Sequence, residues 1–553
     1  MASARALRES LGVLALAVLL TVFHTYPVAF QLGRVGRVDS GDGRWSVWVV
    51  NWVAHALLTD PANLFNANIF HPHSGTLGYS EPNLGGGVLA VPVLWATGNP
   101  MAAHNSVALA SFALALLAAY ALVRHLTGSR TASLFTAIAF AFCPCAFSRT
   151  AWIHLMLGAG IPLSLLAMHR FVAQASIARA VTIGAVLAAQ GVTCGYYGVF
   201  AGLAVAFGLL FFAATRGLWR SPRYWMGVAL ALFTTVALLA PLLVRYAALQ
   251  GEGFGRSLQE STLYSANWPA YLASSAWAHR WMLPLIGRWT DVLFPGFLTI
   301  AMGLLGVIVG LRVREGRVRD HTAFYAVLGG LAFWASFGPA AGLYSLLYRA
   351  VPAFSFLRAP SRLGIMVVLC LAVLAGLGLA ELQKRRPRLW SPVAIALSIL
   401  LTAELTTMPL RWPRAYTVPD VHLMLATLPH GAVVEFPFYR EPPDYYRHSL
   451  YMLLSTYHWQ PLLNGYSDHI PDDFRVIAGP VSRFPSREAF RLLQQRGIRY
   501  ALFHLNLYGS GRGNLIAALR EQDRYLRPLR LEESMLLYEI VAWPAASGGA
   551  ATR

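Results

Sequence analysis

Long apolar runs recur along the chain from Leu11 to Pro409, and short clusters of arginine separate most of them. A helix needs roughly 20 apolar residues to cross the hydrocarbon core of a bilayer. The runs therefore predict an α-helical polytopic membrane protein with about eleven spans. The predicted spans are 11–30, 101–123, 131–148, 155–173, 180–194, 196–215, 224–247, 291–311, 321–338, 362–382 and 390–409.

The arginine clusters predict how these spans are oriented. Lys and Arg concentrate in cytoplasmic loops, so Arg5 and Arg8 place the N-terminus in the cytoplasm. The run 84–98 is apolar but rich in Gly and Pro, and it predicts a segment that dips into the membrane without crossing it. Every strong basic cluster between spans then lies inside. The C-terminal end is therefore predicted to be extracytoplasmic.

The pattern changes after Pro409, and this change divides the chain. Residues 1–409 form the predicted transmembrane domain, which includes a long first outer loop at about 31–100. Residues 410–553 form a predicted small extracytoplasmic α/β domain. Its buried strands are expected at 432–436, 499–505 and 535–541, and a helix capped by Ser486 and ended by Gly497 is expected between them.

Composition supports the membrane assignment. The chain of 553 residues is 56% hydrophobic and 12% charged, whereas a soluble domain is about 25% charged. The formal charge of +19 does not indicate nucleic acid, because it is spread in small clusters between apolar runs. All four cysteines lie in or beside apolar runs and are interpreted as small buried hydrophobes.

An aromatic stripe follows the first span. Trp45, Trp48, Trp52 and His55 recur at helical spacing and share one face of a helix. An aromatic face at the start of a membrane loop predicts a helix lying in the bilayer interface.

The predicted first outer loop contains three carboxylates that could take part in chemistry. Asp39 and Asp42 lie in a Gly-rich turn directly before the aromatic helix, and Glu81 follows Tyr79 and Ser80 where the chain re-enters the membrane. One interpretation is a turn with Asp42 near a helix N-terminus, which favours negative charge. The other is a catalytic base at the membrane surface, with Glu81 as a second candidate base or sugar contact.

Several residues on the predicted outer side could bind phosphate or sugar. Arg358 and Arg362 flank a proline at the start of a span, with Arg349 nearby. Arginine's planar fork bonds phosphate oxygens bidentately, although arginines at helix ends also extend to the interface without binding a ligand. Three further candidates have an equally ordinary interpretation as interfacial or belt residues: His154, Tyr196 and Tyr197.

The loop and helix pattern resembles the GT-C superfamily of polytopic glycosyltransferases, and bacterial members with a soluble C-terminal domain in particular. The resemblance covers most of the chain and implies a bacterial cytoplasmic (inner) membrane as the location. The stretches that carry it are Asp39 to Asp42, Asp60-Pro61-Ala-Asn-Leu-Phe65, Phe70-His-Pro-His73, Leu77-Gly-Tyr-Ser-Glu81, Cys194-Gly-Tyr-Tyr197, Phe356-Leu-Arg358-Ala-Pro-Ser-Arg362 and His458-Trp-Gln-Pro-Leu-Leu-Asn464-Gly-Tyr466.

The resemblance implies an inverting transfer from a polyprenyl-phosphate sugar donor, bound at the outer leaflet, to a hydroxyl of a glycan, lipid or protein acceptor. It implies a first-loop carboxylate as base, a role that falls on Asp42, with Asp39 second. The chain lacks the Trp-Trp-Asp motif of oligosaccharyltransferases, so transfer to Asn is not expected. The second outer loop, 149–154, has no carboxylate. A divalent metal therefore stays an open question, and no other cofactor is expected.

Two other classes of function stay open. A transporter or lipid flippase places charged residues inside its helices, whereas these interiors are nearly uncharged and Glu404 is the main exception. The third class is a non-catalytic membrane scaffold whose soluble domain binds a partner.

Overall fold

The computed structural model describes residues 2–251, 255–313 and 316–545. The chain divides into two compact units. The first unit comprises Met1–Leu32, Asn83–Gly86 and Asn105–Trp412, and the second comprises Gly33–Pro82, Gly87–His104 and Pro413–Arg553.

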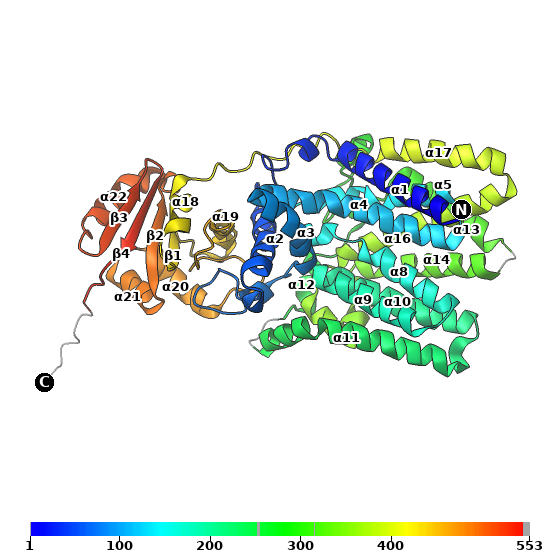
Figure 1. Ribbon diagram of the computed structural model, residues 1–553, viewed down its shortest axis with the longest axis horizontal. Coiled ribbons are helices and arrows are strands. Elements are labelled where there is room, and N and C mark those ends of the chain that lie inside the picture. Colours follow the sequence, from blue (N-terminus) through cyan, green and yellow to red (C-terminus); the bar gives the residue numbers. More distant parts are fainter. Residues whose placement is uncertain (1, 252–254, 314–315, 546–553) are drawn as a thin grey trace. The chain divides into compact units, whose positions relative to one another are not determined.

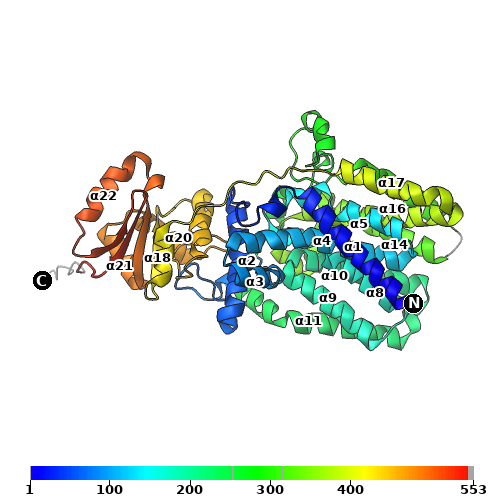
Figure 2. The ribbon, with the colours of Figure 1, turned by 45° about the horizontal axis from the view of Figure 1, so that its top comes forward.

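The first unit is helical, and its long helices run side by side in both views (Figures 1 and 2). Two helices, α3 and α4, pass from one unit to the other along the chain. The helices that lie wholly or mainly in this unit are α1 (Ala2–His24), α4 (Pro100–Thr127), α5 (Arg130–Ala141), α6 (Pro144–Ser148), α7 (Ile153–Met156), α8 (Gly160–Ala173), α9 (Ile177–Thr193), α10 (Gly195–Thr215), α11 (Pro222–Gly251), α12 (Leu258–Leu263), α13 (Phe297–Leu311), α14 (Gly316–Ser336), α15 (Leu343–Ala350), α16 (Gly364–Arg385) and α17 (Pro387–Glu404).

Helix α16 is the packing centre of the first unit. It contacts α5, α13, α14 and α17, and 94% of its most apolar window is buried. Glycines allow the backbones of α13 and α16 to approach closely: a Cβ at Gly306 would lie 2.0 Å from the carbonyl oxygen of Leu374, and one at Gly378 would lie 2.5 Å from Cα of Gly306. Small residues at such crossings are typical of helices that pack within a membrane.

The helices agree with a multi-pass membrane protein. Every predicted span contains a helix. Within the described residues, six stretches are long and apolar enough to cross a membrane: Ala4–His24, Pro100–Thr127, Arg130–Ser148, Gly195–Thr215, Pro222–Gly251 and Pro360–Arg385. The predicted total of about eleven spans stays a prediction.

Helix α3 (Leu84–Thr97) occupies the segment that was predicted to dip into the membrane. Its 14 residues correspond to about 21 Å at 1.5 Å per residue, which is less than the core thickness of about 30 Å.

The second unit carries a small mixed sheet (Figure 1). Its strands run in the order β1-β2-β4-β3; β1 and β2 are parallel, and the other pairs are antiparallel. The unit's strands and remaining helices are β1 (Ala432–Phe436), β2 (Ile498–His504), β3 (Leu526–Leu531), β4 (Met535–Ile540), α2 (Gly41–Thr59), α18 (Asp420–Thr427), α19 (Ser449–Ser455), α20 (Asp472–Ser482), α21 (Arg487–Gln495) and α22 (Arg512–Arg520).

The three predicted strands and the predicted helix are confirmed, whereas β3 was not predicted. Strand β3 reads Leu-Arg-Pro-Leu-Arg-Leu and is largely exposed, so it shows no buried apolar run. The hydroxyl of Ser486 caps α21 by accepting a hydrogen bond from the amide of Ala489 at 3.2 Å. Gly497 ends that helix with a φ of +63°, a conformation that glycine adopts without strain.

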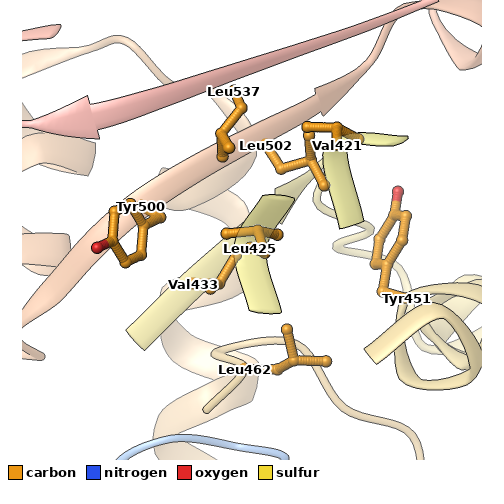
Figure 3. Packing of buried hydrophobic residues seen from close by; sticks show 8 residues of the cluster. All are labelled: Val421, Leu425, Val433, Tyr451, Leu462, Tyr500, Leu502 and Leu537. Carbon is orange, nitrogen blue, oxygen red and sulfur yellow. The ribbon is translucent and has the colours of Figure 1, made fainter. Parts of the chain in front are cut away.

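Side chains from the sheet, α18, α19 and the segment after α19 form the core of the C-terminal part (Figure 3). Burial of such side chains is the main favourable term in folding. The eight core residues are Val421, Leu425, Val433, Tyr451, Leu462, Tyr500, Leu502 and Leu537.

The aromatic stripe of α2 packs onto protein. Trp48 is only 1% exposed, and its indole N–H donates to Oδ1 of Asn68 at 3.0 Å. The ring of His55 stacks on Trp459 with centroids 4.4 Å apart. The prediction of a helix is confirmed. Trp48 packs against protein, and the position of α2 in the bilayer interface stays a prediction.

First-loop and C-terminal residues are joined by hydrogen bonds within the second unit. The side-chain amide of Asn68 donates to Oγ of Ser455 and to the carbonyl oxygen of Gln460 at 3.1 and 3.2 Å. The amide of His71 donates to the carbonyl oxygen of Leu462 at 2.8 Å. Residues 461–463 in turn pair with Val433 of β1. The C-terminal sheet is thereby connected to the first loop.

Candidate functional site

A tight glycine-containing turn sets the position of Asp42. Ser40 caps α2, because its hydroxyl accepts a hydrogen bond from the amide of Gly43 at 3.1 Å. A Cβ at Gly43 would lie 1.8 Å from the carbonyl oxygen of Arg37, so only glycine fits there. Asp42 consequently lies in the first turn of α2, where the helix dipole favours a carboxylate.

The hydroxyl of Tyr466 contacts this carboxylate. It donates a hydrogen bond to Oδ1 of Asp42 at 3.0 Å, and both side chains are half-buried. Tyr466 is held in place by its neighbours: the carbonyl oxygen of Asn464 accepts from the amide of Phe70 at 3.2 Å, and a Cβ at Gly465 would lie 2.6 Å from the ring of Phe70. The Asn-Gly-Tyr motif therefore brings a phenol from the C-terminal part to a first-loop carboxylate.

Asp39 has a different environment from Asp42. Its two carboxylate oxygens accept hydrogen bonds from Nε and Nη2 of Arg37 at 3.1 and 3.3 Å. The Asp39 side chain is 48% exposed, so this ion pair is well solvated. The structure therefore places Asp42 beside Tyr466 and pairs Asp39 with arginine.

Glu81 is half-buried near the C-terminal end of the first loop. Its neighbour Ser80 donates a hydrogen bond to Oδ2 of Asp468 at 2.7 Å. Directly after that, the amide of His469 donates to the carbonyl oxygen of Tyr79 at 2.9 Å. The run from Asn464 to His469 therefore follows the first loop and adds Asp468 to its carboxylates.

The same loop is held to α20 by an ion pair outside the membrane helices. Burial would raise the pKa of the Asp473 carboxyl, but hydrogen bonds from His73 and Arg496 hold that pKa below its usual value. The two contacts are 2.8 Å to Nε2 of His73 and 3.0 Å to Nη2 of Arg496.

In the first unit, two predicted phosphate-binding arginines gather at one tyrosine. The backbone amide of Arg358 donates to the hydroxyl of Tyr196 at 2.9 Å. The guanidinium carbon of Arg362 lies 4.0 Å from the centroid of the same ring, a cation–π contact. The structure therefore brings together three of the predicted site residues.

This arginine and tyrosine cluster contains one carboxylate and a third guanidinium. Oε1 of Glu260 lies 3.2 Å from Nη1 of Arg256 and 3.5 Å from Nη1 of Arg358. The second contact is long for a hydrogen bond. Two guanidinium groups, those of Arg256 and Arg358, therefore meet at this carboxylate.

Tyr197 has a mainly structural position. It is buried, its hydroxyl donates to the carbonyl oxygen of Leu155 at 2.8 Å, and it accepts from Nη1 of Arg149 at 3.2 Å. Nη2 of Arg149 also pairs with Oδ2 of Asp291 at 2.9 Å. His154 is buried in α7, within the same stretch of chain.

Arg349 differs from the other predicted arginines. It is exposed in the last turn of α15. An arginine that extends from a helix end to the membrane interface would have the same position.

Three residues that take part in the contacts described above were not among the predicted site residues: Tyr466, Glu260 and Asp291. Tyr466 lies in a motif that carries the family resemblance, so its Asn-Gly-Tyr run could have indicated it. Glu260 and Asp291 are carboxylates in the predicted outer loop 248–290 and at its border, where acidic residues are rare in this chain. The contacts of Glu260 with Arg358 and of Asp291 with Arg149 could not be inferred, because 98 and 142 residues separate the partners along the chain. The contact of Glu260 with Arg256, four residues away, is local.

A divalent cation of the Mg²⁺ class prefers oxygen ligands, which Asp42 could supply. The site's metal dependence stays open.

No protein-family model matches the chain, and no curated protein matches its sequence. Solved structures do match. The oligosaccharyltransferase AglB from Archaeoglobus fulgidus, in complex with an inhibitory peptide and a dolichol-phosphate, has a TM-score of 0.51 at 13% identity, covering 94% of this chain and 72% of AglB. A structure of the Archaeoglobus fulgidus oligosaccharyltransferase with Zn and sulfate has a TM-score of 0.50 at 13% identity, with coverages of 95% and 72%. ArnT from Cupriavidus metallidurans, in the apo state, has a TM-score of 0.51 at 15% identity and covers 98% of both chains.

Both proteins are GT-C superfamily membrane glycosyltransferases. The fold is the GT-C fold. The match extends over nearly the whole chain, so the GT-C fold here includes the first loop and the C-terminal residues as well as the helices. At these identities the likeness defines the fold, and the site rests on the contacts described above.

Proposed function

We propose that this protein is a membrane glycosyltransferase that moves a sugar from a polyprenyl-phosphate donor to a hydroxyl acceptor, with Asp42 as the base. The observation that carries the proposal is the carboxylate of Asp42, held by Tyr466 at the start of a first-loop helix, in a chain of GT-C fold. The AglB structure with a dolichol-phosphate supports a lipid-linked donor.

The base has a simple task. A sugar or lipid hydroxyl is a weak nucleophile, and a carboxylate within hydrogen-bond reach can accept its proton as the new bond forms. Tyr466 fixes the carboxylate orientation through Oδ1. A single displacement by the activated hydroxyl inverts the configuration at the sugar carbon, so we propose an inverting reaction.

The leaving group sets the second requirement. A polyprenyl phosphate leaves as an anion, so it needs cations that hold its charge more than it needs an acid. Arg358 and Arg362, both anchored at Tyr196, supply planar forks for its oxygens. We assign them to the donor phosphate, and we place the reaction at the outer face of the cytoplasmic membrane on the charge pattern of the loops.

A transporter function would need charged residues inside the helices, and Glu404 is the main candidate. The contacts of Glu404 indicate a structural role instead. Glu404 accepts hydrogen bonds from the amides of Phe297 and Leu298, the latter at 3.1 Å, at the N-terminus of α13. Nε2 of His279 lies 3.0 Å from its Oε1. The carboxylate therefore caps a helix, which is a structural role.

The experiment for this proposal is a donor panel. Purified protein is incubated with radiolabelled polyprenyl-phosphate sugars, with and without added Mg²⁺ or Mn²⁺, and scored for transfer or hydrolysis. The proposal expects release of free polyprenyl phosphate from at least one donor. Binding of a donor with no turnover under every condition would favour the scaffold function instead.

A further inference from the structure

A group of histidines surrounds one carboxylate inside the C-terminal part of the second unit. His422 lies on α18, Glu435 on β1, and His458 three residues after α19. His422 and Glu435 are 0% exposed, and His458 is 8% exposed. One potential ligand atom from each of the three lies within 4.8 Å of the others.

The polar atoms of this group are incompletely satisfied. Oε1 of Glu435, both ring nitrogens of His422 and Nε2 of His458 have no hydrogen-bond partner among the described residues. Leaving a buried polar atom unpaired is costly, and a buried carboxylate oxygen especially so. Four such atoms gather at this one place.

We propose that His422, Glu435 and His458 bind one divalent transition-metal ion, with Zn²⁺ as the best-matched species. Two imidazoles and one carboxylate are ligands that Zn²⁺ accepts. None of its three ligands has a role in the proposed reaction, and the site does not depend on the proposed function. Because it is closed to solvent, its role is to hold α18, β1 and the segment after α19 together.

The surroundings already orient the carboxylate. Nε2 of His504 lies 2.5 Å from Oε2 of Glu435, and Nε2 of His422 lies 3.6 Å from the same oxygen. The side chain of Asn464 makes two hydrogen bonds to the backbone of Glu435: its Oδ1 accepts from the Glu435 amide at 2.7 Å, and its Nδ2 donates to the Glu435 carbonyl oxygen at 2.9 Å. Hydrogen bonds to a ligating carboxylate are a usual part of a metal site. His504 therefore acts as the residue that positions Glu435.

Binding requires a small adjustment. Ligand atoms around a tetrahedral Zn²⁺ lie about 3.3 Å apart, given metal–nitrogen distances of about 2.0 Å. The three side chains must therefore close by rotation. The amide of Gln460 donates to Nδ1 of His458 at 3.0 Å, so Nε2 of that ring carries the proton in the metal-free protein. On binding through Nε2, the proton moves to Nδ1 and the contact with Gln460 opens.

The test is the metal content of the full-length protein in detergent, purified through a tag without histidine and measured by inductively coupled plasma mass spectrometry. The proposal expects about one equivalent of transition metal after incubation with Zn²⁺ and removal of excess ion. It also expects chelator-treated protein to unfold at a lower temperature and to recover on addition of Zn²⁺.

His422→Ala and Glu435→Gln should lose the bound equivalent, whereas His430→Ala should retain it, because His430 is exposed in the same unit. If the first two variants do not fold, the wild-type protein still decides. Chelator-treated wild type loaded with Co²⁺ should show the visible absorption of a tetrahedral nitrogen and oxygen site. No sulfur band is expected, since all four cysteines lie in the first unit. Wild-type protein with no bound metal after loading, and with no chelator effect on unfolding, would overturn the proposal.

Discussion

Asn68→Ala should strongly destabilise the second unit, because this side chain joins the first loop to C-terminal residues. Asn68 is 7% exposed. It accepts from Nε1 of Trp48 and donates to Ser455 and to the carbonyl of Gln460. Alanine removes all three hydrogen bonds and leaves the buried indole N–H without its acceptor.

The magnitude follows from these contacts. Each intramolecular hydrogen bond contributes about 1 kcal/mol, so the expected loss is about 3 kcal/mol. For a cooperative unit of roughly 200 residues, this corresponds to a fall in melting temperature of about 6–12 °C. The control is Asn66→Ala, an exposed residue in the same loop whose hydrogen bonds water can replace. It should cost less than about 1 kcal/mol.

Thermal unfolding of the purified protein in detergent, followed by tryptophan fluorescence, measures both variants. Limited proteolysis at a temperature between their melting points should cleave Asn68→Ala first. The double variant with Ser455→Ala should be destabilised less than the sum of the single variants, since both remove one shared contact. Equal melting temperatures for Asn68→Ala and Asn66→Ala would refute the claim that Asn68 joins the first loop to the C-terminal residues.

Three further predictions concern the site and the topology. Tyr466→Phe should slow transfer several-fold at unchanged donor affinity, because it removes the hydrogen bond to Asp42 and keeps the ring; a change in KM alone, with kcat unchanged, would contradict this. Arg362→Lys should bind the donor more weakly than wild type but more tightly than Arg362→Ala, since Lys keeps the charge without the fork, and equilibrium binding of a labelled donor measures it. A cysteine introduced at exposed position 472 should react with an impermeant thiol reagent in intact cells, and one at exposed position 317 should react only after lysis. The four native cysteines are buried and should give little background, and the reverse labelling would contradict the predicted orientation.

Helix positions were predictable because hydrophobic periodicity and turn chemistry are local. Ser486 and Gly497 delimit α21 as their residue types indicate, and each predicted span contains a helix. Strand β3 was missed because an exposed strand with Pro528 has no local apolar pattern. The aromatic stripe of α2 predicted a helix in the bilayer interface, and no local pattern indicated that His55 stacks on Trp459, some four hundred residues away along the chain.

The candidate site shows the same limit. Asp42 was predicted from its turn, and the glycine at position 43 explains why the turn is so tight. The contact with Tyr466 depends on how residues 464–469 pack on the first loop, and no local pattern encodes that packing. Likewise, Arg358 and Arg362 were predicted, whereas their meeting at Tyr196 emerges only from the packed helices.

The most direct test of the central claim is the transfer rate of Asp42→Asn. Asn keeps the size of Asp and its hydrogen bond from Tyr466, but it cannot accept a proton at neutral pH. We expect a rate reduced by about 10²–10⁴-fold with folding and donor binding retained, and a smaller effect for Asp39→Asn, whose carboxylate is paired with Arg37. If Asp42 only stabilises the start of α2, Asn should serve nearly as well, because both residues suit a helix N-terminus. Full transfer activity in Asp42→Asn would contradict the assignment of the base.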